Sequence, residues 1–160
     1  MKRPALVAYG LAVAIIVADQ LVKLWVLQGL GLGDGHVEPV VWPLQLNLVW
    51  NRGVSFGLFG GEAELTRWLL TAFAAIVSVI LAVWVRRMDR PLTGVGIGLV
   101  MGGALGNMID RIRFGAVVDF VDVTRLHVFP WVFNVADSAI TVGVIVLLAE
   151  GLLTPEKRAT

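Results

Sequence analysis

The stretch ALVAYGLAVAIIVADQLVKLWVL, residues 5–27, is almost wholly apolar, and only Asp19 and Lys23 in it carry charge. About 20 mostly apolar residues cross the hydrocarbon core of a bilayer as a helix, so this stretch predicts a transmembrane helix. Lys2 and Arg3 precede it, as they would in a secretory signal. Because no small-x-small cleavage pattern follows, we expect the helix to be retained.

Three further stretches have the same character, at residues 65–85, 92–108 and 134–153. The composition agrees, because 58% of the residues are hydrophobic, 16% are charged and the mean hydropathy is +0.83, whereas a soluble domain carries about 25% charged residues. The net charge of +1 suggests no nucleic-acid partner, and the lack of cysteine excludes thiol catalysis and disulfides. We therefore expect an all-α membrane protein with four transmembrane helices, formed by residues 1–160 as one unit.

Basic residues gather on one side of this predicted bundle. They precede the first helix, connect the second to the third and follow the fourth: Lys2, Arg3, Arg86, Arg87, Arg90, Lys157 and Arg158. Short cytoplasmic segments are enriched in Lys and Arg, so both termini are expected in the cytoplasm. Residues 28–64 and 109–133 are then expected on the outer side of the membrane.

The outer segment 28–64 carries a strand pattern. Residues 44–48, LQLNL, alternate apolar and polar side chains, Asn51-Arg52-Gly53 has the composition of a turn, and residues 54–56 resume an extended pattern. This predicts a small β-hairpin, or cradle, on the membrane surface, and segment 109–133 adds a short interfacial stretch. Pro39 and Pro43 restrict the pairing to an edge or an irregular strand.

The third predicted helix has one face of small residues and a polar end. Glycines recur every four residues from Gly94 to Gly106, which in lipid favours close helix packing. Asn107, Asp110 and Arg111 follow at its outer end, where Asn107 shares a face with the other two if the helix continues. Asp110 and Arg111 are either interfacial charges or part of an orienting network with Asn107. Asp19 and Lys23, four residues apart on the first helix, are expected to pair as structural or site-supporting groups.

The fourth predicted helix carries a polar stripe of Asn134, Asp137, Ser138 and Thr141. Ionisable side chains in membrane segments are costly and usually face a cavity or a partner. The stripe either hydrogen-bonds a neighbouring helix or serves a site shared with Asp119, a carboxylate in an apolar loop at the same level. Two carboxylates in a poorly hydrated site share a proton, which is the arrangement of an aspartyl peptidase.

Five sequence blocks together resemble the lipoprotein signal peptidases, the signal peptidase II family of bacterial membrane aspartyl peptidases. The blocks, in order, are DQLVK at 19–23, NRGVSFG at 51–57, GGALGNMIDR at 102–111, VVDF at 117–120 and FNVADS at 133–138. Each block alone is weakly specific, but all five occur in family order across nearly the whole chain. The resemblance implies a multi-pass protein of the bacterial cytoplasmic (inner) membrane.

The resemblance also implies roles for individual residues. Asp119 and Asp137 correspond to the catalytic dyad, and the residues lining the substrate site are Asn51, Asn107, Arg111 and Asn134, with Arg52 beside them in the turn. Asp19, Lys23 and Asp110 occupy supporting positions. The implied reaction cleaves prolipoproteins before a diacylglyceryl-modified cysteine, without metal or cofactor, in contact with membrane lipids. Globomycin-like cyclic peptides are the implied inhibitors.

Three other hypotheses use the same residues. A proton-coupled transporter or channel would relay protons through Asp19, Asp110 and Asp137, although relays usually lie at mid-membrane depth. A metal-dependent hydrolase would use Asp110, Asp119, Asp122 and His127 as ligands. A membrane scaffold without enzymatic activity would tolerate neutral replacements at both dyad positions.

The turn residues Asn51 and Arg52 also allow two interpretations, since they either shape the turn or hold the substrate backbone.

Overall fold

The computed structural model describes residues 2–33, 37–53, 63–127 and 130–153. Four long helices form a bundle: α1 (Arg3–Leu24), α2 (Ala63–Trp84), α3 (Pro91–Phe114) and α4 (Val135–Leu153). A π-helical turn, Trp25–Gly29, extends α1, and a 3-10 turn, Val85–Arg87, extends α2. All four are long and apolar enough to cross a membrane, so the prediction of four spanning helices is confirmed.

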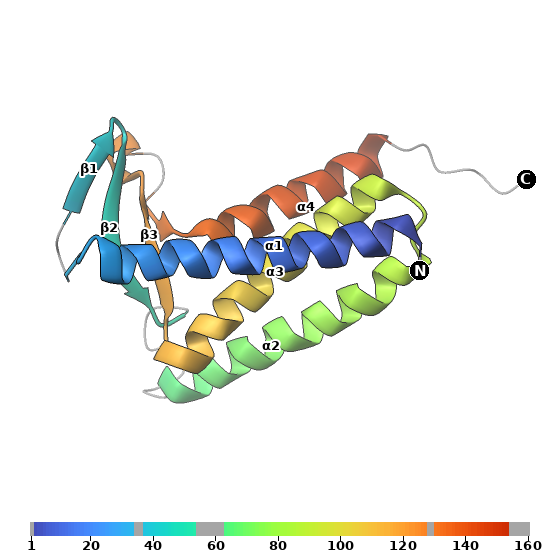
Figure 1. Cartoon of the computed structure of the whole chain (residues 1–160), viewed down its shortest axis with the longest axis horizontal. Helices are drawn as coiled ribbons and strands as arrows, with labels where there is room; N and C mark the ends of the chain where they lie inside the picture. The colour runs from blue at the N-terminus through green and yellow to red at the C-terminus, as the bar shows by residue number, and fades with distance from the viewer. Residues whose placement is uncertain (1, 34–36, 54–62, 128–129, 154–160) are drawn as a thin grey trace, which may run out of the picture.

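Helix α3 lies between α2 and α4 and also packs against α1 (Figure 1). Its glycines allow close approach on two faces. A Cβ added at Gly98 would lie 2.7 Å from the carbonyl oxygen of Ala8 in α1, and one added at Gly96 would lie 2.7 Å from Cγ of Leu147 in α4. The predicted close packing of the small-residue face is therefore present.

Helix α3 is longer than the predicted 92–108, because it continues through Asp110 and Arg111 to Phe114. Gly115 then ends it in the left-handed conformation, with φ of 76°, and its N–H donates to the carbonyl oxygen of Arg111 over 3.1 Å. Arg67 of α2 donates from Nε to the same carbonyl over 2.7 Å. The charged residues that suggested an end to the apolar span are thus part of the helix.

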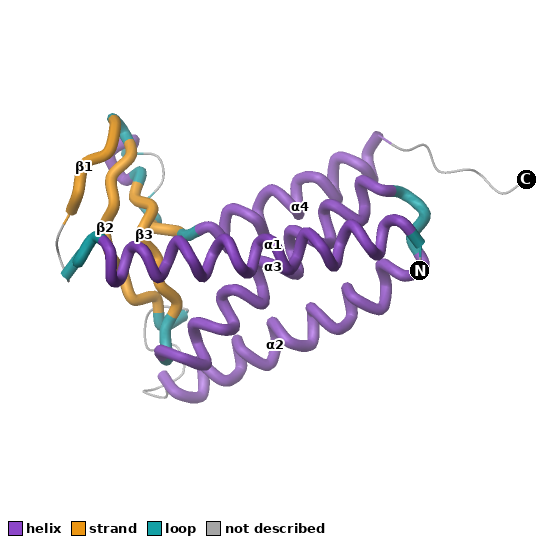
Figure 2. Tube along the Cα trace, viewed as in Figure 1, coloured by secondary structure: helices purple, strands orange, loops and turns teal. Residues whose placement is uncertain are grey.

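A four-stranded antiparallel sheet lies at one end of the bundle, in the order β1 (Val37–Val41), β2 (Leu44–Asn51), β3 (Val117–Asp122) and β4 (Val132–Phe133). The strands gather beyond the end of α1, and the start of α1 and the end of α4 lie at the opposite end of the bundle (Figure 2).

The hairpin among the described residues precedes the predicted turn at Asn51–Gly53, where the N–H of Gly53 donates to Oδ1 of Asn51 over 2.9 Å. The hairpin is formed by β1 and β2, which are joined at Trp42-Pro43, and the second neighbour of β2 is the distant strand β3. Pro39 lies in the edge strand β1, as its missing N–H requires. The predicted continuation at 54–56 lies outside the described residues.

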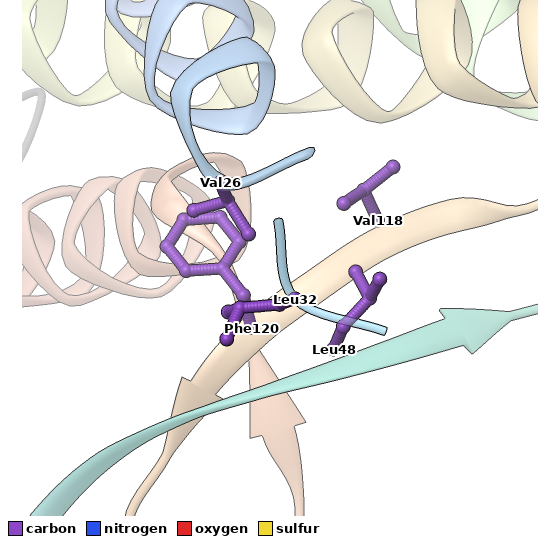
Figure 3. Packing of buried hydrophobic residues seen from close by; sticks show 5 residues of the cluster. All are labelled: Val26, Leu32, Leu48, Val118 and Phe120. Carbon is purple, nitrogen blue, oxygen red and sulfur yellow. The ribbon is translucent and has the colours of Figure 1, made fainter. Parts of the chain in front are cut away.

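Asp119 also differs from its prediction, since it lies in β3 and not in a loop. Apolar residues of β3 and β2 pack against the end of α1 in a buried cluster: Val26, Leu32, Leu48, Val118 and Phe120 (Figure 3). Side chains on the two faces of a strand alternate, so this apolar face leaves Asp119 on the other face of β3. The cluster thereby fixes the sheet across the polar end of the bundle.

Candidate active site

Asp119 is 2% exposed and is held by two amide side chains. Asn51, at the end of β2, donates from Nδ2 to Oδ2 of Asp119 over 2.9 Å. Asn134, just before α4, donates from Nδ2 to Oδ1 over 2.6 Å. Both carboxylate oxygens are therefore oriented by donors from different parts of the chain.

Asp137 lies in the first turn of α4 and makes a reciprocal cap with Asn134. The N–H of Asp137 donates to Oδ1 of Asn134 over 2.8 Å, and the N–H of Asn134 donates to Oδ2 of Asp137 over 3.3 Å. Asn107 of α3 donates from Nδ2 to Oδ1 of Asp137 over 2.8 Å. A negative charge is favoured at this end of a helix, so the cap suits an aspartate.

Asn134 joins the two carboxylates, because its side-chain amide contacts Asp119 and its backbone N–H contacts Asp137. The other two members of the polar stripe donate to backbone carbonyls one turn earlier, Ser138 to that of Asn134 over 3.0 Å and Thr141 to that of Asp137 over 2.9 Å. The part of the stripe that faces the sheet is therefore the Asn134–Asp137 pair. This brings together the two aspartates that the sequence suggested as a pair.

Burial raises the pKa of Asp119 from 3.8 to about 7. The hydrogen bond from Asn51 opposes this rise, the negative charge of Asp137 adds to it, and the hydrogen bond from Asn134 and the charge of Lys23 oppose it. A carboxyl group with this pKa holds or releases a proton near neutral pH. It is therefore suited to general acid–base chemistry.

Lys23 holds two buried carboxylates behind this pair. Its Nζ lies 2.7 Å from Oδ2 of Asp19 and 2.7 Å from Oδ2 of Asp110, and it donates to Oδ1 of Asn107 over 3.2 Å. The expected Asp19–Lys23 pair is therefore present and includes Asp110 as well. Because both carboxylates are bound by one lysine, the structure gives no support to a proton relay through them.

The same two carboxylates also fix the backbone around the site. Oδ1 of Asp19 accepts from the N–H of Ala136 over 2.9 Å, which ties α1 to the start of α4. Oδ2 of Asp110 accepts from the N–H of Val118 over 3.1 Å, which ties α3 to β3. The elements that carry Asp119 and Asp137 are thus bound to a common support.

The two candidate arginines differ in position. Arg111 of α3 is half-buried, donates from Nη1 to the carbonyl oxygen of Asn107 over 3.4 Å, and lies within electrostatic reach of Asp137 and Asp119. Its Nε is buried and has no hydrogen-bond partner among the described residues. Arg52 is exposed beyond β2 and makes no hydrogen bond or ion pair within the described part of the chain.

Sequence reasoning missed Gln20, which donates from Nε2 to Oδ1 of Asp110 over 2.8 Å. A polar residue beside Asp19 in an apolar helix was the available signal. The proposed metal ligands do not come together, since the described residues contain no group of three His, Cys, Asp or Glu side chains placed to hold a metal ion. His127 is exposed, while Asp122 is buried and bound by Gln45 and Asn47.

The architecture matches solved bacterial membrane enzymes. One, described as a bacterial membrane enzyme determined in meso at 2.3 Å resolution, aligns with a TM-score of 0.77 at 28% identity over 96% of this chain and 94% of its own. Another, determined in meso at 1.9 Å, aligns with a TM-score of 0.80 at 27% identity over 92% of this chain and 94% of its own. Fold and buried acidic site together define a polytopic membrane enzyme.

The sequence comparisons identify the family. The family model described as signal peptidase (SPase) II matches residues 11–153. The lipoprotein signal peptidase of Caulobacter vibrioides is 49% identical over 99% of this chain and 94% of its own length, and that of Rhodopseudomonas palustris TIE-1 is 43% identical over 89% of each. The chain belongs to the signal peptidase II family, and it is a multi-pass peptidase of the bacterial inner membrane.

Proposed function

We propose that this chain is an aspartyl endopeptidase that removes the signal peptide from lipid-modified prolipoproteins, with Asp119 and Asp137 as its catalytic dyad. The observation that carries this proposal is the contact of both carboxylates with one residue, Asn134. Burial and the charge of Asp137 both favour a proton on Asp119, so the pair holds one proton between two acids near neutral pH.

The reaction follows from this shared proton. The ionised member of the pair takes a proton from water, and the water oxygen attacks the carbonyl carbon of the scissile peptide. The protonated member donates a hydrogen bond to the carbonyl oxygen and then gives a proton to the leaving amine as the C–N bond breaks. No metal or cofactor takes part in these steps.

The surrounding polar groups suit the substrate backbone. Asn51 and Arg111 lie at the dyad with donors that can bind peptide carbonyls, and Asn107 and Asn134 orient the two acids. Arg52, exposed just beyond Asn51, serves the same substrate face. The scissile bond precedes a diacylglyceryl-modified cysteine, whose acyl chains stay among the membrane lipids, and globomycin-like peptides occupy the same site.

The site lies at the outer surface of the inner membrane. The sheet and the dyad share one end of the bundle, and the connection that carries Arg86, Arg87 and Arg90 lies at the other end. The basic connection favours a cytoplasmic location, which places both termini inside. A lipid-modified cysteine in the outer leaflet then reaches the dyad directly.

Replacement of either dyad aspartate tests the proposal. Asp119→Asn and Asp137→Asn should each lower cleavage of a purified lipid-modified prolipoprotein by about 100- to 10,000-fold, because each removes one acid–base group. Asp89→Asn, a matched change at an exposed residue whose carboxylate pairs with Lys2, should cleave normally. Cleavage is followed by the gel shift of the precursor in detergent. Full activity in either dyad variant would refute the assignment.

A further inference from the structure

A second buried carboxylate in β3, Asp122, makes contacts that the proposed reaction does not use. Its Oδ2 accepts from Nε2 of Gln45 over 2.8 Å and from Nδ2 of Asn47 over 3.1 Å, both in β2. Its Oδ1 accepts from the N–H of Thr124 over 2.8 Å. Asp122 is 2% exposed, so these donors satisfy a charge that has lost nearly all its water.

The contacts of Asp122 lie beside an irregularity in the β2–β3 pairing. Gln45 pairs with Asp122 and Leu46 with Val121, but Val49 pairs with Asp119, so β2 holds one residue more than β3 between these pairs. An extra residue in one strand is a β-bulge, and it moves the following side chains of that strand to the opposite face. Asn47 lies within this bulge.

The bulge determines which face of the sheet Asn51 occupies. Without it, the pairing would run on from Leu46–Val121, so that Leu48 would oppose Asp119 and Asn51 would oppose Ala116. Asn51 would then share a face with Val118, in the apolar cluster. With the bulge, Leu48 packs in that cluster (Figure 3). Asn51 then lies on the other face and donates to Asp119.

We propose that Asp122 is a positioning residue for the peptidase reaction, because its bonds to Gln45 and Asn47 fix the bulged register that brings the Asn51 amide to Asp119. This inference rests on the proposed catalytic role of Asp119. The ionised carboxylate of Asp122 accepts hydrogen bonds only, and both amide groups of β2 donate to the same oxygen. An asparagine at 122 has one acceptor oxygen in place of two, so it cannot accept from the amides of β2 and from the N–H of Thr124 together.

If the bulged register is lost, Asp119 loses its hydrogen bond from Asn51. That hydrogen bond lowers the pKa of Asp119, so its loss moves the pKa above its present value of about 7. Other groups act on Asp119 from the neighbouring elements: Asp137 and Asn134 at α4, Lys23 in α1 and Arg111 in α3. None of them is in β2, so a register change leaves their contributions in place.

A double-mutant cycle of Asp122→Asn and Asn51→Ala tests the coupling. Each single variant should lower kcat/KM by roughly 10-fold, which corresponds to about 1.4 kcal/mol, and should move the alkaline limb of its pH profile upward. In the Asn51→Ala background, Asp122→Asn should change kcat/KM by less than about 2-fold, because the contact it positions is already absent. Asp89→Asn serves as the charge-matched control. Independent, multiplying effects of the two changes would overturn the proposal, and so would an unchanged pH profile in Asp122→Asn.

Hydrogen exchange separates this inference from the proposed function. In Asp122→Asn, the amides of β2 from Val49 to Asn51 should exchange at least about 10-fold faster than in the parent, whether or not Asp119 is catalytic. Unchanged exchange would overturn the register role alone, whereas full activity of Asp119→Asn would overturn the catalytic role alone. If Asp122→Asn does not fold, Asn47→Ala removes one donor of the same contact and should shift the pH profile in the same direction. No shift in Asn47→Ala would then refute the inference.

Discussion

Asp119 and Asp122, three residues apart in β3, have pKa values shifted in opposite directions. Burial raises the pKa of Asp119 to about 7, and its two amide donors only partly oppose this rise. Burial also acts to raise the pKa of Asp122, but the hydrogen bonds from Thr124, Gln45 and Asn47 outweigh it and leave that pKa below 3.8. At Asp119, burial and the charge of Asp137 outweigh the two amide donors, whereas at Asp122 the donors outweigh burial, so the two pKa values shift in opposite directions.

The raised pKa of Asp119 makes folding stability depend on pH. Between pH 4 and 7, about the range from its unfolded to its folded pKa, the folded chain binds more protons, so the free energy of unfolding falls as pH rises. Asp119→Asn lacks this dependence. We expect its melting temperature in detergent to rise relative to that of the parent as pH goes from 4 to 8. The parent has lost all the stability that protonated Asp119 provides once pH exceeds about 7. A constant difference in melting temperature across this range would contradict the burial of the charge.

At the scale of elements, hydropathy predicted the helices because about 20 consecutive apolar residues are typical of a membrane-spanning helix. It ended α3 early, since Asp110 and Arg111 looked like interfacial charges, whereas the structure binds Asp110 to Lys23. It also missed the pairing of β2 with β3, because alternation marks a strand but not its partner. Polar residues on apolar backgrounds were enough to suggest Asp119 and Asp137 as a candidate pair. The bulge at Asn47 could not be predicted, since it depends on the pairing of β2 with β3.

The packing of α3 on α1 predicts unequal effects for one substitution at two glycines. Gly98→Ala should lower the free energy of unfolding by about 1–3 kcal/mol, because its Cβ would meet the backbone of Ala8. Gly10→Ala should not lower the free energy of unfolding, since a Cβ at Gly10 has nothing within 4 Å. Unfolding of both variants in detergent gives the comparison. Equal destabilisation would show that close approach of the helices is not what the glycines provide.

At the scale of the whole molecule, the proposed orientation places the sheet outside and the α2–α3 connection inside. The natural chain has no cysteine, so single cysteines report on each side without background. Trp42, between β1 and β2, and Asp89, in the α2–α3 connection, are both well exposed. The sheet and this connection lie at opposite ends of the bundle (Figure 1). In spheroplasts, a membrane-impermeant thiol reagent should label Trp42→Cys directly, and Asp89→Cys only after lysis. The reverse pattern would contradict the orientation.

The central claim is that Asp119 and Asp137 act on each other closely enough to share one proton. The most direct test is a titration of the Asp119 carboxyl carbon by NMR, in the parent chain and in Asp137→Asn. Because the charge of Asp137 raises the pKa of Asp119, neutralising it should lower that pKa from about 7. An Asp119 titration that is identical in both proteins would contradict the dyad.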